Sequence, residues 1–468
     1  MRKIVFCLSL TLTVLALLNV SIAGTPTVLY NFCSQPNCTD GANPEADLAV
    51  DLAGNLWGTT RNGGAHGFGT IFELTKSSGF TTFVQAYSFQ GGSDGAFPEA
   101  GLVFDSQTQT FYGTTSVGGG KGSCSGGCGT IFEFVPSNAA EQVLHSFGAS
   151  GDGAIPLAGL LPDSSQNFYG TTSAGGSTAN CTGGCGTVFS MNPITNTYNV
   201  LYKFTGSVKT ADGADPVAAL VFDSKGNLWG TAQKGGSKNF GAIFELASPG
   251  FTNLAFKHSF KGTPNGASPA AALTFDKSVG GALGTLYGTT SAGGNRACSG
   301  GCGIVFELKI SGPVIGIIYK LTGAGAGKTG AVPVGRLTLD DTGDAHEGHL
   351  YGTASMGGTN TGNCPSTGCG TLFEICPPTI SCTGYARGSL IFDFDVTHGE
   401  NPLAGVLLDV PGADELFGGG SLDGLPAREG DDQDPGPQTG KGVCTANCVG
   451  TSVSGGANGK GVVVKIGP

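Results

Sequence analysis

Fourteen of the fifteen cysteines stand in close pairs, and such pairs can form either disulfides or metal sites. Only Cys7 is unpaired in this way, and it lies near the N-terminus. Structural zinc usually takes ligands two residues apart and gathers four of them, whereas three to five residues separate the members of these pairs. We therefore expect disulfides. The seven pairs are Cys33/Cys38, Cys124/Cys128, Cys181/Cys185, Cys298/Cys302, Cys364/Cys369, Cys376/Cys382 and Cys444/Cys448.

A second set of candidate residues recurs in the motif Asp-Gly-Ala, which is followed at a fixed distance by proline. One reading is a ring of carboxylates that binds a cation or sugar hydroxyls. The other is that Asp-Gly forms an Asx-type turn before proline starts the next element, and repetition in every copy favours it. The candidate binding residues are Asp40, Asp94, Asp152 and Asp212, with Asn265, Thr329 and His398 at the matching positions.

These candidates belong to a repeat of about 57 residues, marked by an aromatic residue followed by Gly-Thr. Six copies are clear, and we place a weaker seventh at Leu416-Phe417-Gly418. The glycine of this motif lies in the middle of a predicted strand, where glycine lowers stability. Close approach of a neighbouring backbone would explain its presence. The aromatic residues are Trp57, Tyr112, Tyr169, Trp229, Tyr287, Tyr351 and Phe417.

Each copy contains four short β-rich runs, which we name strands A to D. In the second copy they are residues 100–104, 111–116, 130–134 and 143–147. No segment has sustained helical apolar spacing, so we expect almost no helix. The period and the strand count predict an all-β, seven-bladed β-propeller of four-stranded blades.

The two ends of the repeat array predict how the ring closes. Residues 27–32 resemble a strand D without strands A to C before it, and residues 462–466 resemble a strand C without a strand D after it. Pairing them would complete the last blade and remove two exposed sheet edges. An open solenoid is the alternative, but it would need capping repeats.

Three motifs together resemble the bacterial GloVer tandem-repeat family. They are Asp-Gly-Ala-x-Pro, Leu-Tyr-Gly-Thr-Thr-x-x-Gly-Gly and Gly-Thr-Val/Ile-Phe-Glu-Leu, and they cover nearly the whole chain after the leader. The resemblance implies an extracellular or surface location and a propeller-like repeat fold. It implies no activity and no catalytic residues.

Residues 1–23 are typical of a cleavable signal peptide, with Arg2 and Lys3 before an apolar run and small residues before Gly24. We expect a secreted, extracellular or periplasmic protein, with residues 24–468 as one propeller domain. Residues 421–443 form a Pro/Gly/Asp-rich insertion in the last blade, and calcium binding by Asp431, Asp432 and Asp434 stays open. No other cofactor is expected.

The charge of the chain limits its partners. Loss of the leader changes the formal charge from −11 to −13, and there is no basic stripe, so nucleic acid is not an expected partner. We also expect no transmembrane segment after signal cleavage, and a monomer. The leading hypothesis is a non-enzymatic binding protein that recognises a carbohydrate or an extracellular protein through its D-to-A and B-to-C loops. The alternative is a carbohydrate-active hydrolase or lyase with channel-mouth carboxylates such as Asp152 and Asp212.

Overall fold

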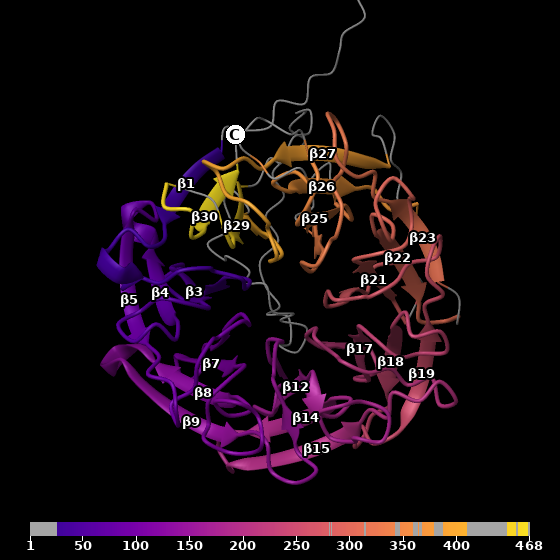
Figure 1. Cartoon of the computed structure of the whole chain (residues 1–468), viewed down its shortest axis with the longest axis horizontal. Coiled ribbons are helices and arrows are strands. Elements are labelled where there is room, and N and C mark those ends of the chain that lie inside the picture. Colours follow the sequence, from indigo (N-terminus) through magenta and orange to yellow (C-terminus); the bar gives the residue numbers. More distant parts are fainter. Residues whose placement is uncertain are drawn as a thin grey trace, which may run out of the picture.

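Seven four-stranded antiparallel sheets stand in a ring around a central channel in the computed structural model (Figure 1). The structure describes residues 26–466 except 280, 282, 313–314, 342–346, 359–363, 365–366, 379–386, 410–446 and 455–456. Strand A of each blade lies next to the channel and strand D lies outermost. The prediction of a seven-bladed propeller is confirmed.

The blades follow one another along the chain. Blade 1 is β2 (Ala49–Val50), β3 (Leu56–Thr60), β4 (Thr70–Thr75) and β5 (Thr82–Ser88); blade 2 is β6 (Val103–Asp105), β7 (Thr110–Thr115), β8 (Thr130–Val135) and β9 (Ala140–Ser146); blade 3 is β11 (Leu161–Pro162), β12 (Phe168–Thr172), β14 (Thr187–Asn192) and β15 (Thr197–Lys203); blade 4 is β16 (Val221–Phe222), β17 (Leu228–Ala232), β18 (Ala242–Leu246) and β19 (Leu254–Ser259). Blade 5 is β20 (Thr274–Asp276), β21 (Thr285–Thr290), β22 (Ile304–Lys309) and β23 (Ile315–Lys320); blade 6 is β24 (Thr338–Leu339), β25 (Leu350–Ala354), β26 (Thr371–Ile375) and β27 (Gly388–Asp393); blade 7 is β28 (Leu407–Asp409), β29 (Asn447–Ser452), β30 (Val462–Ile466) and β1 (Pro26–Asn31).

Helical structure is almost absent, as expected. Within the described ranges the helices are three 3₁₀ turns, η1 (Pro36–Cys38), η2 (Lys76–Ser78) and η3 (Pro136–Asn138). Accordingly, this part of the chain contains no apolar helix of membrane-spanning length. A further strand pair, β10 (Gly153–Ala154) with β13 (Ala174–Gly175), joins two loops of the third blade.

The ring closes by pairing of the two ends of the chain. Strand β1 runs antiparallel to β30, with Pro26 opposite Ile466 and Asn31 opposite Val462. The predicted closure is therefore confirmed, and no blade is left with an unpaired strand C.

The position of the seventh repeat motif is a correction. Strand B of blade 7 is β29, which pairs with β28 and β30 and carries Gly450-Thr451-Ser452. Leu416-Phe417-Gly418, which we took for this strand, lies outside the described residues. The weak match misled us because a long insertion follows strand A of this blade and the aromatic residue before Gly450 is replaced by Val449.

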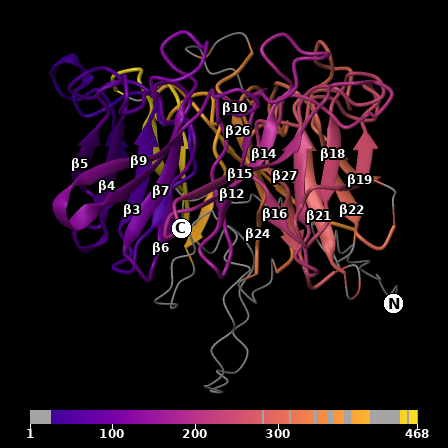
Figure 2. The same cartoon turned by 90° about the horizontal axis from the view of Figure 1, so that it is seen from below.

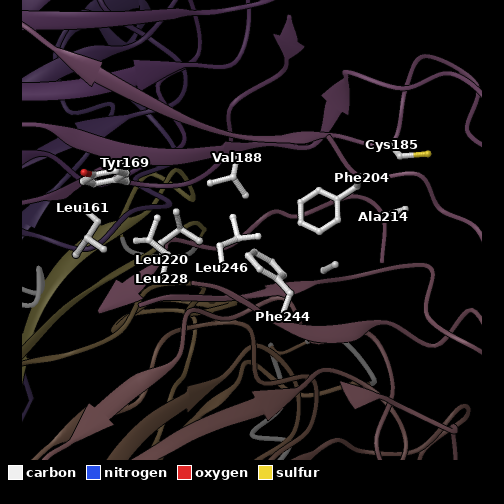
Figure 3. Close-up of a cluster of buried hydrophobic side chains, with 11 residues drawn as sticks. Leu161, Tyr169, Cys185, Val188, Phe204, Ala214, Leu220, Leu228, Phe244 and Leu246 are labelled. Carbon is white, nitrogen blue, oxygen red and sulfur yellow. The ribbon is translucent and has the colours of Figure 1, made fainter. Parts of the chain in front are cut away.

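The hydrophobic core is divided into seven clusters, one at each blade-to-blade interface. Figure 3 shows the cluster between blades 3 and 4, where Phe204 and Val188 of one blade face Phe244 and Leu246 of the next. The cluster between blades 7 and 1 joins Leu407 and Val463 to residues such as Phe72. Burial of apolar surface thus stabilises every interface of the ring, the closing one included.

The mid-strand glycine is explained by a side chain within its own blade. Gly170 of β12 lies opposite Phe189 of β14, and a Cβ at this glycine would come within 2.4 Å of the Phe189 ring. We expected the backbone of a neighbouring blade at this point, and that expectation is wrong. The glycine makes room for a phenylalanine ring that folds across strand B.

In six of the seven blades a threonine of strand B donates a hydrogen bond to the segment that leads into strand A of the next blade. In blade 5 the Oγ1 atom of the matching residue, Thr289, is buried without a partner among the described residues. The Oγ1 atoms of Thr59, Thr114 and Thr171 donate to the carbonyl oxygens of Ala100, Ala158 and Ala218. Thr451 donates in the same way to Ala46 across the closure. The small residues of strand A allow this close approach.

The D-to-A connections and the B-to-C loops emerge on the same face of the ring, which we call the DA/BC face (upper edge in Figure 2). Backbone bridges join the two kinds of loop, for example Ala96 with Val117 and Ala214 with Lys234. These bridges show that the two kinds of loop, which we expect to recognise the partner, lie on one face.

Candidate functional site

The four predicted aspartates each accept a hydrogen bond from an aromatic side chain of a strand D. Tyr30, Tyr87 and Tyr202 donate their hydroxyl groups to Asp40, Asp94 and Asp212, at 2.7, 2.6 and 3.0 Å. Asp152 is held at 2.5 Å by Tyr198 and at 3.0 Å by His145. These bonds fix each D-to-A connection to the outermost strand.

The hydrogen bonds also hold two of these carboxylates in the charged form. Burial disfavours the charge of Asp40, but bonds from Tyr30 and Ser34 outweigh this effect and lower its pKa. Burial likewise opposes the charge of Asp152, and His145 and Tyr198 outweigh it, so that this pKa is also lowered. Hydrogen-bond donors within the protein already occupy these carboxylates.

The site around Asp94 differs because a second carboxyl group lies beside it. Glu141 of β9 occupies this place, and its buried Oε1 atom has no hydrogen-bond partner. Burial, together with the neighbouring Asp94, raises the pKa of Glu141 to about 9. Blade 2 therefore carries a protonated carboxyl at neutral pH between two outer strands.

The other three predicted residues have different surroundings. The Thr329 hydroxyl is buried and lies 3.2 Å from the hydroxyl of Thr322, while Asn265 is exposed. His398 Nδ1 lies 2.8 Å from the Asp395 carboxylate.

The seven predicted residues are not gathered in one place, because each belongs to a different D-to-A connection around the ring. Asp152 and Asp212 also lie beside the outer strands, so the alternative that places them at the channel mouth is wrong on this point. That the seven residues bind a ligand stays a prediction.

The described disulfides all stiffen the DA/BC face. Cys33–Cys38 lies in a D-to-A connection, and Cys124–Cys128, Cys181–Cys185, Cys298–Cys302 and Cys364–Cys369 lie in B-to-C loops. The disulfide prediction is confirmed for these five pairs. Cys382 and Cys444 lie outside the described residues, so the last two pairs stay predictions. Cys448 lies in β29, which is strand B of blade 7.

The residue before each connection proline has a left-handed backbone in all seven blades. The φ angles lie between 53° and 59° even for Ile155 and Val332, whose branched side chains disfavour this region. The N–H groups of Ile155 and Val332 donate to the carbonyls of Cys128 and Cys302 in the preceding blade. Four of the seven connections are tied in this way to a disulfide-bearing loop, an arrangement that the residue types did not predict; the donors are Ile155, Asp215, Val332 and Asn401.

A mixed-charge cluster stands beside the inner strands of blades 1 and 2. Arg61, directly after β3, lies 3.1 Å from Glu99 and 4.0 Å from Glu45. Ser116 donates to Glu99 at 2.9 Å, and the Arg61 guanidinium lies 5.5 Å from the centre of the Phe97 ring. Since Glu45 and Glu99 lie in the segments that lead from the D-to-A connections into strand A, this cluster lies at the DA/BC mouth of the channel.

Sequence reasoning missed this cluster, although the repeat contains a signal for it. The residue after the connection proline is apolar in five copies and glutamate only at Glu45 and Glu99. The residue that follows strand B is serine in four copies and arginine only at Arg61. A search for the positions at which one copy differs from the others would have found Glu45, Arg61 and Glu99.

The channel wall carries one further pair of opposite charges. Asp47 and Arg336 occupy a position shortly before strand A that is glycine or alanine in the other five blades. Asp47 accepts a 2.6 Å hydrogen bond from the Gly405 backbone. Burial raises the Asp47 pKa, and the charge of Arg336 and the Gly405 bond oppose that rise. Asp47, Gly405 and Arg336 belong to blades 1, 7 and 6, so their interactions stabilise the interfaces on both sides of the closing blade.

The described residues contain no cluster of three or more His, Cys, Asp or Glu side chains that could hold a metal ion. The calcium hypothesis concerned Asp431, Asp432 and Asp434, which lie outside the described residues. It therefore stays untested.

The chain belongs to the family described as the Gloeobacter/Verrucomicrobia repeat, which matches residues 16–182, 121–364 and 179–430 in overlapping units. This is the family that the motifs indicated. No curated protein matches the chain.

Solved propeller structures resemble the fold at low sequence identity. The GH74 enzyme of Niastella koreensis is 13% identical over 73% of this chain, with a TM-score of 0.45, and the match spans 45% of that enzyme. TolB from Acinetobacter baumannii is 13% identical over 73% of this chain and 65% of its own, with a TM-score of 0.38. An oligogalacturonate lyase from Vibrio parahaemolyticus is 9% identical over 95% of this chain and 93% of its own, with a TM-score of 0.45.

Proposed function

We propose that this protein is a secreted, non-enzymatic binding propeller that recognises a carbohydrate or an extracellular protein through its DA/BC face. The observation that carries the proposal is the coincidence of two features on that face. All described disulfides stiffen its loops, and the charged departures from the repeat at Glu45, Arg61 and Glu99 lie at its centre. Rigid loops around a non-repeating site reduce the entropy lost on binding.

Its location is part of the proposal. The disulfides are expected in an oxidising compartment, which for a bacterial repeat family is the periplasm or the exterior. The apolar leader agrees with export.

The first experiment is a glycan-array and extracellular-protein screen of the mature chain, with and without calcium. A matched pair of variants then tests which face of the ring binds the ligand. Met356 is exposed next to strand B on the DA/BC face, whereas Leu52 is exposed in the A-to-B loop on the opposite face. We expect Met356→Glu to weaken binding and Leu52→Glu to leave it unchanged. The reverse result, or an absence of binding together with hydrolysis of a polysaccharide panel, would contradict the proposal.

One observation favours hydrolysis as a second candidate function. Burial and the nearby Glu99 carboxylate raise the pKa of Glu45 to about 7, with Arg61 in partial opposition, while Glu99 is ion-paired to Arg61. A protonated acid beside an ionised carboxylate is the arrangement that glycoside hydrolysis uses. Release of reducing sugar by the wild type, and its loss in Glu99→Gln, would favour this candidate over binding.

A further inference from the structure

Within the channel-mouth cluster of Glu45, Arg61 and Glu99, the Glu45 carboxylate is the hydrogen-bond acceptor that no described residue satisfies. Its side chain is only 20% exposed, and its nearest cation is Arg61 at 4.0 Å. It accepts no hydrogen bond from any described residue, whereas Glu99 is bound by both Arg61 and Ser116. Partial burial of a carboxylate that accepts no hydrogen bond from the protein is unfavourable, so a ligand that brings donors is favoured there.

Arg61 adds donors to the same place. Its Nε atom donates to Glu99, and a guanidinium carries four further N–H groups. The Arg61 side chain is 40% exposed and is held against the Phe97 ring. The Glu45 carboxylate and the remaining N–H groups of Arg61 therefore lie together at the DA/BC mouth of the channel.

This combination selects among classes of ligand. Vicinal hydroxyl groups both donate and accept, so they match Glu45 and Arg61 together. An ammonium group only donates and would be repelled by the guanidinium, and an acidic ligand would be repelled by the two glutamates. The rest of the mouth is half-buried and apolar, which suits the C–H faces of a sugar ring; its residues are Leu157, Val217, Ala270, Val334 and Leu403.

We propose that Glu45 and Arg61 form a subsite that binds a vicinal diol of an uncharged sugar, with Glu99 holding Arg61 in place. This inference rests on the proposed function, because it names the ligand class of the same face.

The test is a titration of the mature chain with neutral oligosaccharides from the array, followed by calorimetry with the best binder. We expect Glu45→Gln to weaken binding about ten-fold or more, the range for a lost hydrogen bond to a charged group. The control is Gln233→Ala, which alters the corresponding position after strand B in blade 4 and should change affinity less than two-fold. Circular dichroism and thermal unfolding verify that each variant is folded.

The pH dependence supplies a second measurement. The charged groups that face Glu45 are Arg61 and Glu99. Hydroxyl donors favour the ionised carboxylate, so wild-type affinity should rise as the pH increases through about 7, and Glu45→Gln should lose that rise.

The possible failures are distinguishable. If the wild type binds a neutral glycan and Glu45→Gln binds it equally well, the subsite is wrong but the binding function stands. If the wild type binds no glycan and no protein, the proposed function itself fails. Salt-sensitive binding of amino sugars alone, or of a protein alone, would overturn the assignment of ligand class.

Discussion

At the scale of single residues, the D-to-A aspartates act first as hydrogen-bond acceptors for strand D. The donor is Tyr30, Tyr87 or Tyr202, each two residues before the phenylalanine that follows its strand. The sequence shows both partners of each pair, with the aspartate seven or ten residues after the tyrosine, so this contact was predictable. The position of Glu141 was not, because its proximity to Asp94 depends on how two blades meet.

Glu141 gives a prediction about pH. Its carboxyl has a pKa of about 9 in the folded protein against an ordinary value of 4.5, so folding favours the protonated form. The stabilisation is complete below pH 4.5 and is lost as the pH rises toward 9. We expect the thermal midpoint of the wild type to fall more between pH 5 and pH 9 than that of Glu141→Gln. Gln142→Ala, an exposed neighbour on β9, is the control; equal pH slopes for wild type and Glu141→Gln would refute this account.

At the scale of the strand, the glycine and phenylalanine pair determines how each blade packs. The alternation of residues predicted strands B and C and their order. The alternation did not show that the Phe189 ring packs over Gly170. An alternation with a period of two shows which face of the sheet a side chain is on, but not which residue of the neighbouring strand it contacts.

Gly170→Ala should destabilise the protein by about 1–3 kcal/mol, because the added methyl group would overlap the Phe189 ring. Thermal or urea unfolding measures the loss. The matched control is Gly312→Ala, where a Cβ meets nothing within 4 Å. A second change, Phe189→Leu, should recover part of the loss in the Gly170→Ala background; a Gly170→Ala protein as stable as the wild type would show that the ring moves freely.

The loop disulfides should contribute less than the strands. Each closes a loop of four or five residues, which corresponds to roughly 2 kcal/mol in the chain-entropy description. Reduction with dithiothreitol should therefore leave the far-ultraviolet circular dichroism of the sheets largely unchanged while lowering the thermal midpoint. Wholesale loss of the β signal would mean that the loops are needed to maintain the ring.

At the scale of the whole molecule, stability depends on seven similar interfaces, one of which closes the ring. The repeat count and the unmatched strands at the two ends were sufficient to predict this closure. The mixed-charge mouth was not predicted, since our search for recurring residues passed over Glu45, Arg61 and Glu99, which do not recur.

Deletion of residues 26–31 should open the ring. It removes β1 and leaves β30 as an exposed edge, which favours pairing between molecules. We expect a lower thermal midpoint than for Thr451→Val, which removes one hydrogen bond worth about 1 kcal/mol, and oligomers in size-exclusion chromatography with light scattering. A monomeric deletion variant with an unchanged midpoint would show that closure is dispensable.

The pairing of β1 with β30 also fixes how the molecule would be oriented on a support. Pro26 lies opposite Ile466, and β1 runs from there toward the DA/BC face, so both residues lie at the reverse side of the ring. Immobilisation through a linker attached beside Pro26 or Ile466 would consequently turn the DA/BC face outward, toward the solution. Surface-bound and dissolved protein should then capture the same ligands, whichever end is attached.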